Sequence, residues 1–225
     1  MAKTMATTNP VKDKYSTHTV ANVQAAIDIQ RYSHIRKLLR VTAYVRRFIC
    51  NCRSDIQSRH TGSLTTQELS AVEISWILHC QQYSYSEEIQ NLRYKKSRLP
   101  IARQLRLYLD QSGIIRCRGR IYHAPLDENT KCPIPLPAKH PLTRLMLLDA
   151  HETQLHSGMH ATICQLRQRF WIPKIHQAVK SLLRTTCVTC RKVSSKPYLT
   201  PYPSPLPKCR VDDLPPFSVT GVDYS

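Results

Sequence analysis

Two histidines followed by two cysteines place the strongest constraint on how this 225-residue chain can fold. His151 and His156 come first, and Cys187 and Cys190 close the stretch as a Cys-x-x-Cys. Imidazole nitrogens and thiolates are the ligands that zinc prefers, and four of them complete one closed tetrahedral site. The close spacing of the two cysteines allows both thiolates to bind one ion. The sequence therefore predicts one structural Zn²⁺ ion that holds a small domain together.

The spacing of the two histidines predicts a break in a helix. They are five positions apart, so on a continuous helix their side chains would diverge by roughly 140° at about 100° per residue. A helix that begins near Leu142 must therefore end between them, and His156-Ser-Gly158 supplies a flexible turn. We expect a second helix from Thr162 to Phe170 and a third helix with Pro173 in its first turn, ending at Cys187.

Other potential metal ligands lie close by in the sequence. His160 and His176 fall within the same stretch, and Cys164 lies in the second expected helix. Either of these histidines could take the place of His151 or His156, because the spacing rule does not decide between neighbouring positions. The residue pattern alone leaves this choice of ligands open.

Basic residues dominate the chain and surround the metal-binding stretch. The formal net charge is +18 and the isoelectric point is near 9.8, which favours polyanionic partners, nucleic acid first. The residues expected to contact nucleic acid are Lys174, Lys180, Arg184, Arg191 and Lys192. None of them has an identifiable partner that would fix a contact to a base edge. We therefore expect salt-sensitive binding with little sequence preference.

The hydrophobic pattern predicts a mainly α-helical chain with a small β element. Residues 1–28 are polar and lack a sustained period, so we expect them to be disordered. Apolar residues at three- and four-residue steps predict a helix over residues 35–49. A further helix is expected over residues 67–82, where Thr65 and Glu68 have the spacing of a capping box.

The remaining segments are shorter or extended. A short helix is expected over residues 85–92, and two short strands are expected over residues 114–117 and 120–122 around a glycine turn. Prolines make residues 133–137 extended, able to lie on a sheet edge at most. The proline-rich residues 197–216 are typical of a semi-rigid, extended linker.

The cellular compartment follows from what the sequence contains. No apolar run approaches the roughly 18 residues of a membrane span, and the first residues lack the apolar stretch of a secretory signal. The nine cysteines are odd in number and scattered, which favours reduced thiols over disulfides. We therefore expect an intracellular protein that does not contact a membrane.

These motifs resemble the zinc-binding N-terminal domain of retroelement integrases. The likeness rests on His-x4-His-x-Gly-x3-Thr beginning at His151, on Phe170-Trp-Ile-Pro173, and on Cys187-x2-Cys190-Arg. Two upstream segments, Leu39–Ile49 and Gly113–Ile121, resemble the region that joins ribonuclease H to integrase in BEL/Pao retrotransposon polyproteins.

The resemblance implies roles and boundaries. It implies that the zinc ligands are His151, His156, Cys187 and Cys190. It divides the chain into a connector of residues 29–136, a three-helix zinc-binding domain of residues 137–196, the linker of residues 197–216, and the start of an integrase catalytic core in residues 217–225. It also implies DNA at the element ends and at the target as partner, a homo-oligomer, and a location in the nucleus or in a cytoplasmic retroelement particle.

Residues Arg210–Ser225 resemble the entry into an integrase catalytic core, and Asp223 matches the first carboxylate of the Asp-Asp-Glu triad. Two-metal phosphoryl transfer needs several carboxylates around paired ions, and the sequence does not contain the second and third. We therefore expect a non-catalytic fragment of a polyprotein whose parent is an integrase. The alternative is a host nucleic-acid-binding zinc protein derived from a retroelement, which the sequence of a continuous transcript would distinguish.

Overall fold

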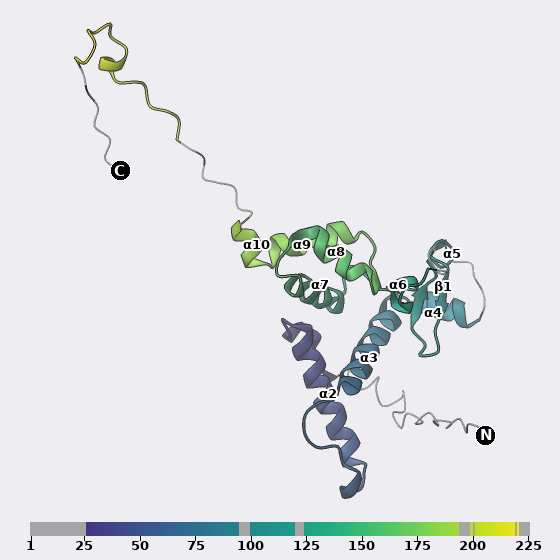
Figure 1. The fold of residues 1–225 in the computed structure, drawn as a ribbon. Coiled ribbons are helices and arrows are strands. Elements are labelled where there is room, and N and C mark those ends of the chain that lie inside the picture. The colour runs from purple at the N-terminus through teal and green to yellow at the C-terminus, as the bar shows by residue number, and fades with distance from the viewer. Residues whose placement is uncertain are drawn as a thin grey trace, which may run out of the picture. The chain divides into compact units, whose positions relative to one another are not determined.

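The computed structural model describes residues 26–94, 100–119, 124–193, 199, 201–218 and 220. The chain divides into two compact units, one up to Val193 and the other from Ser194 onward. The first unit is built mainly from helices, with two small β-sheets (Figure 1). The predicted fold class, mainly α with a small β element, is confirmed. The segment expected to be disordered lies outside the described residues up to position 25.

The two long helices expected in the first half of the chain are both present. Helix α2 spans Ile35–Cys52, and α3 spans Thr66–Ser84. The two helices pack against each other, and the Trp76 indole N–H donates to the Thr42 hydroxyl at 3.1 Å inside their interface. Short 3₁₀ helices precede them, η1 over Ile29–Arg31 and η2 over Ile56–Ser58.

Helix α3 begins at the predicted capping box. The Glu68 N–H donates to the Thr65 hydroxyl at 3.3 Å, and the Thr65 N–H donates to the Glu68 carboxylate at 2.8 Å. The same carboxylate accepts two hydrogen bonds from the Arg47 guanidinium of α2, at 2.6 and 2.8 Å. Chiefly because of these bonds from Arg47, the pKa of Glu68 falls to about 2. One carboxylate therefore both caps α3 and fixes it to α2.

A two-stranded antiparallel sheet follows helix α4 (Ser86–Arg93) and α5 (Pro100–Gln104). Strand β1 (Leu107–Leu109) pairs with β2 (Ile115–Cys117), so that Tyr108 lies opposite Arg116.

The structure pairs β2 with a strand that the sequence analysis did not predict. Strand β2 was predicted, but its partner β1 precedes it in the chain, whereas the partner was expected to follow it. The Asp110 carboxylate stabilises the turn between β1 and β2, because it accepts the backbone N–H groups of Ser112 and Ile114, at 2.9 and 3.0 Å. The second expected strand, residues 120–122, lies outside the described residues.

The buried side chain of Gln81 connects α3 to both sheets. Its amide nitrogen donates to the carbonyls of Ile115 and Pro135, both at 3.1 Å, and its amide oxygen accepts the Ile115 N–H at 2.8 Å. Pro135 belongs to strand β3 (Ile134–Pro135), which follows the short helix α6 (Glu128–Lys131) and pairs in parallel with β4 (Phe170–Trp171). The proline-containing segment is therefore extended, as expected.

Four helices form the second half of the unit: α7 (Pro141–Thr153), α8 (Gly158–Arg167), α9 (Ile175–Thr185) and α10 (Val188–Val193). Two expected boundaries are wrong. Helix α8 begins and ends earlier than expected, because Phe170 is needed in β4. Pro173 precedes α9 and is not in its first turn, because Lys174 forms the N-cap in a left-handed conformation with φ of 51°. Helix α10 continues past Cys190 as far as Val193.

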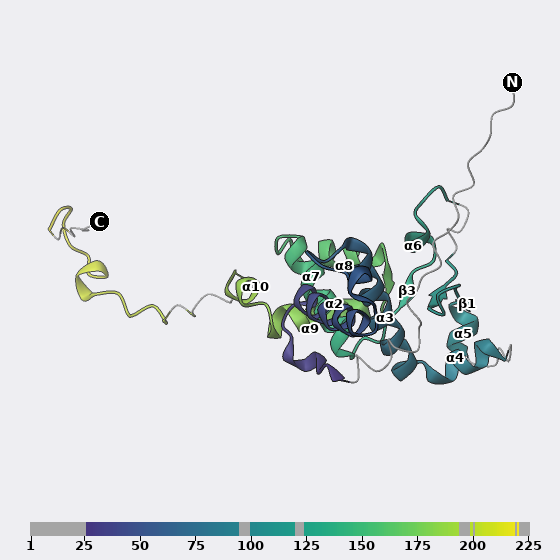
Figure 2. The same ribbon diagram turned by 90° about the horizontal axis from the view of Figure 1, so that it is seen from below.

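One hydrophobic core joins both halves of this unit. Its buried residues come from α2, α3, α7, α8 and α9, and include Leu38, Trp76, Leu142, Ile163 and Val179. Helix α7 contacts α2, α3 and η1 as well as α8 and α9, and these helices gather in one group when seen from below (Figure 2). The core therefore continues across the predicted boundary at residues 136 and 137, which itself stays a prediction.

The described residues of the second unit have little regular structure. Residues 201–207 form neither helix nor strand, and the 3₁₀ helix η3 (Lys208–Arg210) follows. Both segments are exposed, in agreement with an extended linker. Phe217 and Ser218 lie in a turn, whereas Asp223 lies outside the described residues. None of the helices in the described part of the chain has the length and apolar character needed to cross a membrane.

Candidate metal centre

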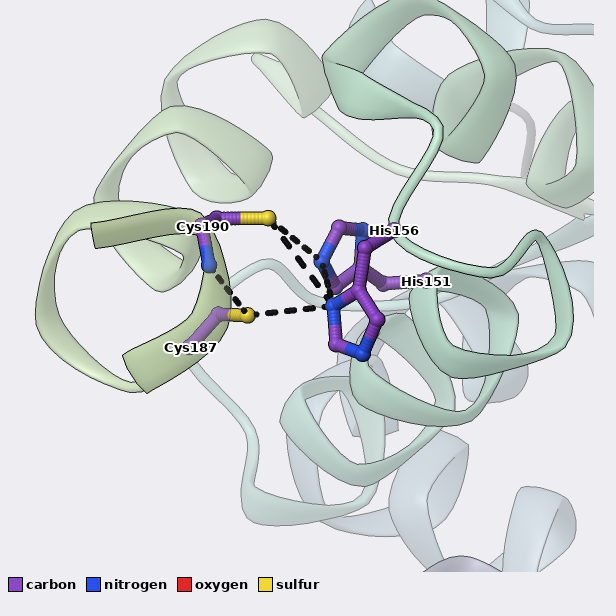
Figure 3. Close-up of side chains that lie close together, drawn as sticks. All are labelled: His151, His156, Cys187 and Cys190. Atoms are coloured by element: carbon purple, nitrogen blue, oxygen red, sulfur yellow. Dashed lines mark hydrogen bonds between the residues drawn. The ribbon is translucent and has the colours of Figure 1, made fainter. Parts of the chain in front are cut away.

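Four side chains with metal-binding atoms converge where α7 and α10 approach each other (Figure 3). They are His151, His156, Cys187 and Cys190, and one ligand atom from each lies within 4.8 Å of all the others. Among the residues that the structure describes, these four side chains form the group of histidine, cysteine or acidic residues that could hold a metal ion. The structure therefore brings together the four residues selected from the sequence.

The two histidines approach each other through the turn after α7. His151 is fully buried in the last turn of this helix, which ends at Thr153. Leu155 and His156 then adopt left-handed conformations with φ of 49° and 60°. This turn brings the His156 N–H to the His151 carbonyl at 3.2 Å. The predicted end of the helix between the two histidines is confirmed, and the chain reverses before Gly158, where it relies on a φ of 91°.

The two cysteines lie in a tight backbone turn. Cys187 directly precedes α10, and Cys190 lies within this helix. The Cys190 N–H donates to the Cys187 sulfur at 3.4 Å. The sequence Cys-x-x-Cys thus places two sulfurs on one side of the turn, facing the histidines.

The separations between these atoms fit one tetrahedral ion. Tetrahedral zinc, with bonds of about 2.0 Å to nitrogen and 2.3 Å to sulfur, requires ligand atoms about 3.3–3.8 Å apart. His156 Nδ1 lies 2.9 Å from His151 Nε2 and 3.2 and 3.8 Å from the sulfurs of Cys187 and Cys190. His151 Nε2 lies 3.2 Å from the Cys190 sulfur. The other two pairs of ligand atoms lie within 4.8 Å, so shifts of up to about 1 Å would create the required geometry.

Thr162 determines which nitrogen of His151 is available to a metal. Its hydroxyl donates to the Gly158 carbonyl at 2.8 Å, so its hydrogen is already used. His151 Nδ1 lies 3.1 Å from the same oxygen, which can only accept a hydrogen bond from it. Nδ1 therefore carries the proton, and Nε2 presents its lone pair to the site. Such a second partner orients a metal-binding histidine and makes it a stronger ligand.

Burial shifts the pKa of His151 and that of Cys190. Burial lowers the pKa of His151, and the neighbouring His156 lowers it further, so the imidazole is held in the neutral form that binds metal. Burial raises the pKa of the Cys190 thiol, and its hydrogen bond with Cys187 adds to the effect. A metal ion must displace thiol protons here, so metal affinity should increase with pH.

The alternative ligands do not join the cluster. His160 and His176 lie against each other, with ring centroids 6.3 Å apart, on α8 and α9. Cys164 is exposed on α8. None of these three residues belongs to the group of converging side chains. Of the candidates that the sequence left open, the geometry of the described residues therefore favours His151 and His156.

The five basic residues selected from the sequence are all exposed: Lys174, Lys180, Arg184, Arg191 and Lys192. Lys180 and Arg184 lie one turn apart on the solvent face of α9, opposite its buried face. Arg191 and Lys192 directly follow the Cys190 position on α10. The structure thus places basic side chains on α9, which precedes Cys187, and on α10, which contains Cys190.

The sequence analysis missed two basic residues next to this surface. Lys139 and Arg144 line a groove of about 520 Å³ between α7 and α9, together with Lys174. The Arg144 guanidinium donates to the Thr186 hydroxyl at 3.3 Å, close to Cys187 in the chain. No local sequence pattern could have revealed these two residues, because it is the packing of α7 on α9 that brings Lys139 and Arg144 close to Lys174.

Residues 138–196 match the family model of the integrase zinc binding domain. All four converging side chains and all five selected basic residues lie within the matched segment. This domain binds zinc, so Zn²⁺ is the metal for which the site is suited. No curated protein and no solved structure matches the chain significantly.

Proposed function

We propose that this chain supplies a zinc-stabilised module that helps a retroelement integrase to bind DNA and assemble. The observation that carries the proposal is the convergence of His151, His156, Cys187 and Cys190 within the segment that matches the integrase zinc binding domain. The donor types, their separations and the family match all support the same metal.

The proposed role of zinc is structural. Its ligands would be Nε2 of His151, Nδ1 of His156 and the two cysteine sulfurs. Four protein ligands fill a tetrahedral site and leave no position for a reacting water. The ion would fix the end of α7 to α10, which are separated in the chain by α8 and α9. In zinc-finger peptides such an ion contributes an apparent 10–16 kcal/mol, roughly, to folding at neutral pH.

We assign the DNA contacts to the exposed basic residues of α9 and α10. Lysine and arginine that approach phosphates release counterions, which supplies affinity without sequence selection. Lys180 and Arg184 on α9 and Arg191 and Lys192 on α10 form a surface beside the metal centre. No carboxylate belongs to the metal-binding cluster in the described residues, so we propose no part for this cluster in phosphoryl transfer.

We further assign the chain to the BEL/Pao type, with action in the nucleus or in a cytoplasmic retroelement particle. The support is the likeness of Leu39–Ile49 and Gly113–Ile121 to the connector of these polyproteins. The first of these segments lies in α2, which contributes to the same core as the zinc-binding segment. In this proposal the connector stabilises the zinc-binding segment, and homo-oligomers form during assembly of the integrase.

The DNA contacts can be tested by salt titration. The zinc-loaded chain is titrated with a labelled blunt DNA duplex at several salt concentrations, and log affinity is plotted against log salt. Replacing Arg191 and Lys192 by alanine should weaken binding to all duplex sequences equally and make the slope shallower by about 0.9 per lost contact.

A matched control is Arg53→Ala with Arg59→Ala, which removes the same charge from exposed positions around the end of α2. This control should bind like the wild-type chain once zinc content is shown to be equal. Equal losses in both variants would mean that overall charge alone attracts the DNA. An affinity that does not depend on salt would contradict the proposal.

A further inference from the structure

The solvent face of α2 carries two basic and two aromatic side chains in one row. Lys37, Arg40, Tyr44 and Phe48 are exposed and follow one another at three- and four-residue steps. Tyr44 is 48% exposed and Phe48 is 69% exposed. Large aromatic side chains grouped on a solvent face commonly mark a binding surface. We refer to these four residues as the α2 row.

Four of the five basic residues of α2 fall into two classes. Arg36 donates to Asp149 at 2.9 Å and to Thr153 at 3.3 Å, and Arg47 is held by Glu68. These residues join α2 to other elements. Lys37 and Arg40 have no ion pair with any residue that the structure describes. Their charges therefore remain available to an external anion.

A groove of about 720 Å³ lies beside the α2 row, between α2 and the end of α7. Lys37, Arg40 and Tyr44 line it on one side, and Leu155, which precedes the metal ligand His156, lines it on the other. Asp149 is already paired with Arg36 at 2.9 Å. Three basic side chains, Arg36, Lys37 and Arg40, outnumber the two carboxylates, Asp149 and Glu152, among the residues that line the groove. The groove is thus electrostatically suited to a negatively charged ligand.

The ring of Tyr44 is held in place from one side. The Arg47 guanidinium lies 5.9 Å from the ring centroid. Arg47 itself is fixed by Glu68 and by the carbonyls of Gly62 and Ser63, at 2.7 and 2.9 Å. A ring oriented by a fixed neighbour loses less entropy when a ligand stacks on it.

We propose that the α2 row binds a single-stranded stretch of nucleic acid. Bases stack on Tyr44 and Phe48, and phosphates lie beside Lys37 and Arg40. A basic surface with aromatic rings along it is the arrangement that suits single strands. The two rings are separated by about 6 Å along the helix axis, more than the roughly 3.4 Å between stacked bases of one strand in a duplex. The rings therefore suit unstacked bases, which a duplex does not offer.

A second copy of the chain is a less suitable occupant. A symmetric dimer through this face would place each α2 row against its own copy. Such a contact would bring four basic side chains together, Lys37 and Arg40 of each copy, while the nearby Asp149 is already paired with Arg36. The basic charge of the row therefore favours a nucleic acid over self-association.

The test uses the full zinc-loaded chain and three fluorescent probes: a single-stranded DNA of about 12 nucleotides, an RNA of the same sequence, and the corresponding DNA duplex. Fluorescence anisotropy gives the affinity for each probe. Tyr44→Ala should weaken binding to single strands about 5- to 100-fold, since each stacked base contributes on that scale. Duplex affinity should change less than about threefold.

Matched variants identify the interaction. Tyr44→Phe keeps the ring and should retain single-strand affinity, whereas Tyr44→Leu keeps an apolar side chain but should lose it. Tyr83→Ala removes another exposed tyrosine, 79% exposed on α3, and should have no effect. Lys37→Gln with Arg40→Gln should reduce the salt dependence for single strands and leaves both rings in place if the tyrosine variants fail to fold.

The probes also distinguish this proposal from the DNA contacts on α9. Lys180→Ala with Arg184→Ala should weaken duplex binding more than single-strand binding, the reverse of Tyr44→Ala. Equal losses for DNA and RNA support stacking on the base alone, and a larger loss for RNA supports an added contact to its 2′-hydroxyl. Retained affinity in Tyr44→Leu, or a dimer that dissociates in Tyr44→Ala with single-strand affinity unchanged, overturns the proposal.

Discussion

The hydroxyl of Thr162 links backbone and metal centre, because it accepts from His151 Nδ1 while donating to the Gly158 carbonyl. Thr162→Val keeps the shape of the side chain but removes both bonds. We expect zinc affinity to fall about 10- to 100-fold, the usual effect of losing a partner of a metal-binding histidine. Competition with a fluorescent zinc chelator measures the zinc affinity of each protein. Thr162→Ser is the control and should bind zinc like the wild-type chain, so equal affinity in all three would contradict the role.

Glu68 gives a prediction with a defined pH range. Arg47 lowers the pKa of Glu68 to about 2 from an ordinary 4.5. A lowered carboxyl pKa stabilises the fold fully above the unfolded value, and this stabilisation is lost as pH falls from about 4.5 to about 2. Glu68→Gln should therefore lower the free energy of unfolding by about 1–3 kcal/mol at pH 7. The deficit should shrink as the pH approaches 2.

Urea denaturation of both proteins at matched zinc content measures this difference. Comparing the two at each pH removes the contribution of zinc release, which affects both. A deficit that stays constant down to pH 2 would show that the Glu68 charge does not stabilise α3.

At the scale of single residues, the sequence predicted the features that depend on residue type and on spacing along the chain. The types and spacing of the histidines and cysteines predicted a zinc site, and the resemblance to retroelement integrases then selected His151, His156, Cys187 and Cys190 as its ligands. The proton position on His151 was not predictable, since it depends on Thr162 across a turn. Lys139 and Arg144 were missed for the same reason, because only packing brings them to α9.

At the scale of elements, the attachment of α3 to the two small sheets depends on one buried side-chain amide, that of Gln81. Gln81 makes three hydrogen bonds to the backbone of Ile115 and Pro135. Gln81→Leu preserves volume but leaves buried backbone groups without partners, which costs about 1–3 kcal/mol for each such group. We expect the free energy of unfolding to fall by about 2–4 kcal/mol in urea denaturation. Gln82→Leu, at an exposed neighbouring position, should cost less than about 0.5 kcal/mol; equal costs would contradict this role of Gln81.

The elements themselves were predictable where a local signal exists. The Thr65–Glu68 capping box predicted the start of α3, and the histidine spacing predicted the end of α7. The pairing of β2 with the preceding strand β1 was not predicted. The Asp110 carboxylate closes the turn between these two strands by accepting two backbone N–H groups, which the hydrophobic pattern does not reveal.

The whole first unit should be more stable than its zinc-binding segment alone. Buried Leu145 of α7 and partly buried Tyr32, which follows η1, belong to one core. A fragment of residues 138–196 would expose the face of α7 that contacts α2, α3 and η1. Full burial of one large apolar side chain contributes about 1.5–3 kcal/mol, so we expect the fragment to be at least about 3 kcal/mol less stable than residues 26–193. Equal stability in urea, with zinc bound in both, would mean that the connector contributes nothing.

The shared core could not be predicted from the sequence. The resemblance to known polyproteins separated a connector from a zinc-binding domain, and each contains helices with its own apolar face. Local periodicity shows that a helix has such a face but not what the face packs against. The association of α2 with α7 arises from contacts about 100 positions apart in the chain, such as Arg36 with Asp149.

The central claim is that one zinc ion is bound by two histidines and two cysteines of this chain. Native mass spectrometry of the intact protein, with Cys187→Ser beside Cys164→Ser as a matched cysteine control, tests it most directly. We predict one zinc per chain in the wild-type and Cys164→Ser proteins and loss of zinc in Cys187→Ser. Unchanged zinc content in Cys187→Ser, or an equal loss in Cys164→Ser, would contradict the assignment.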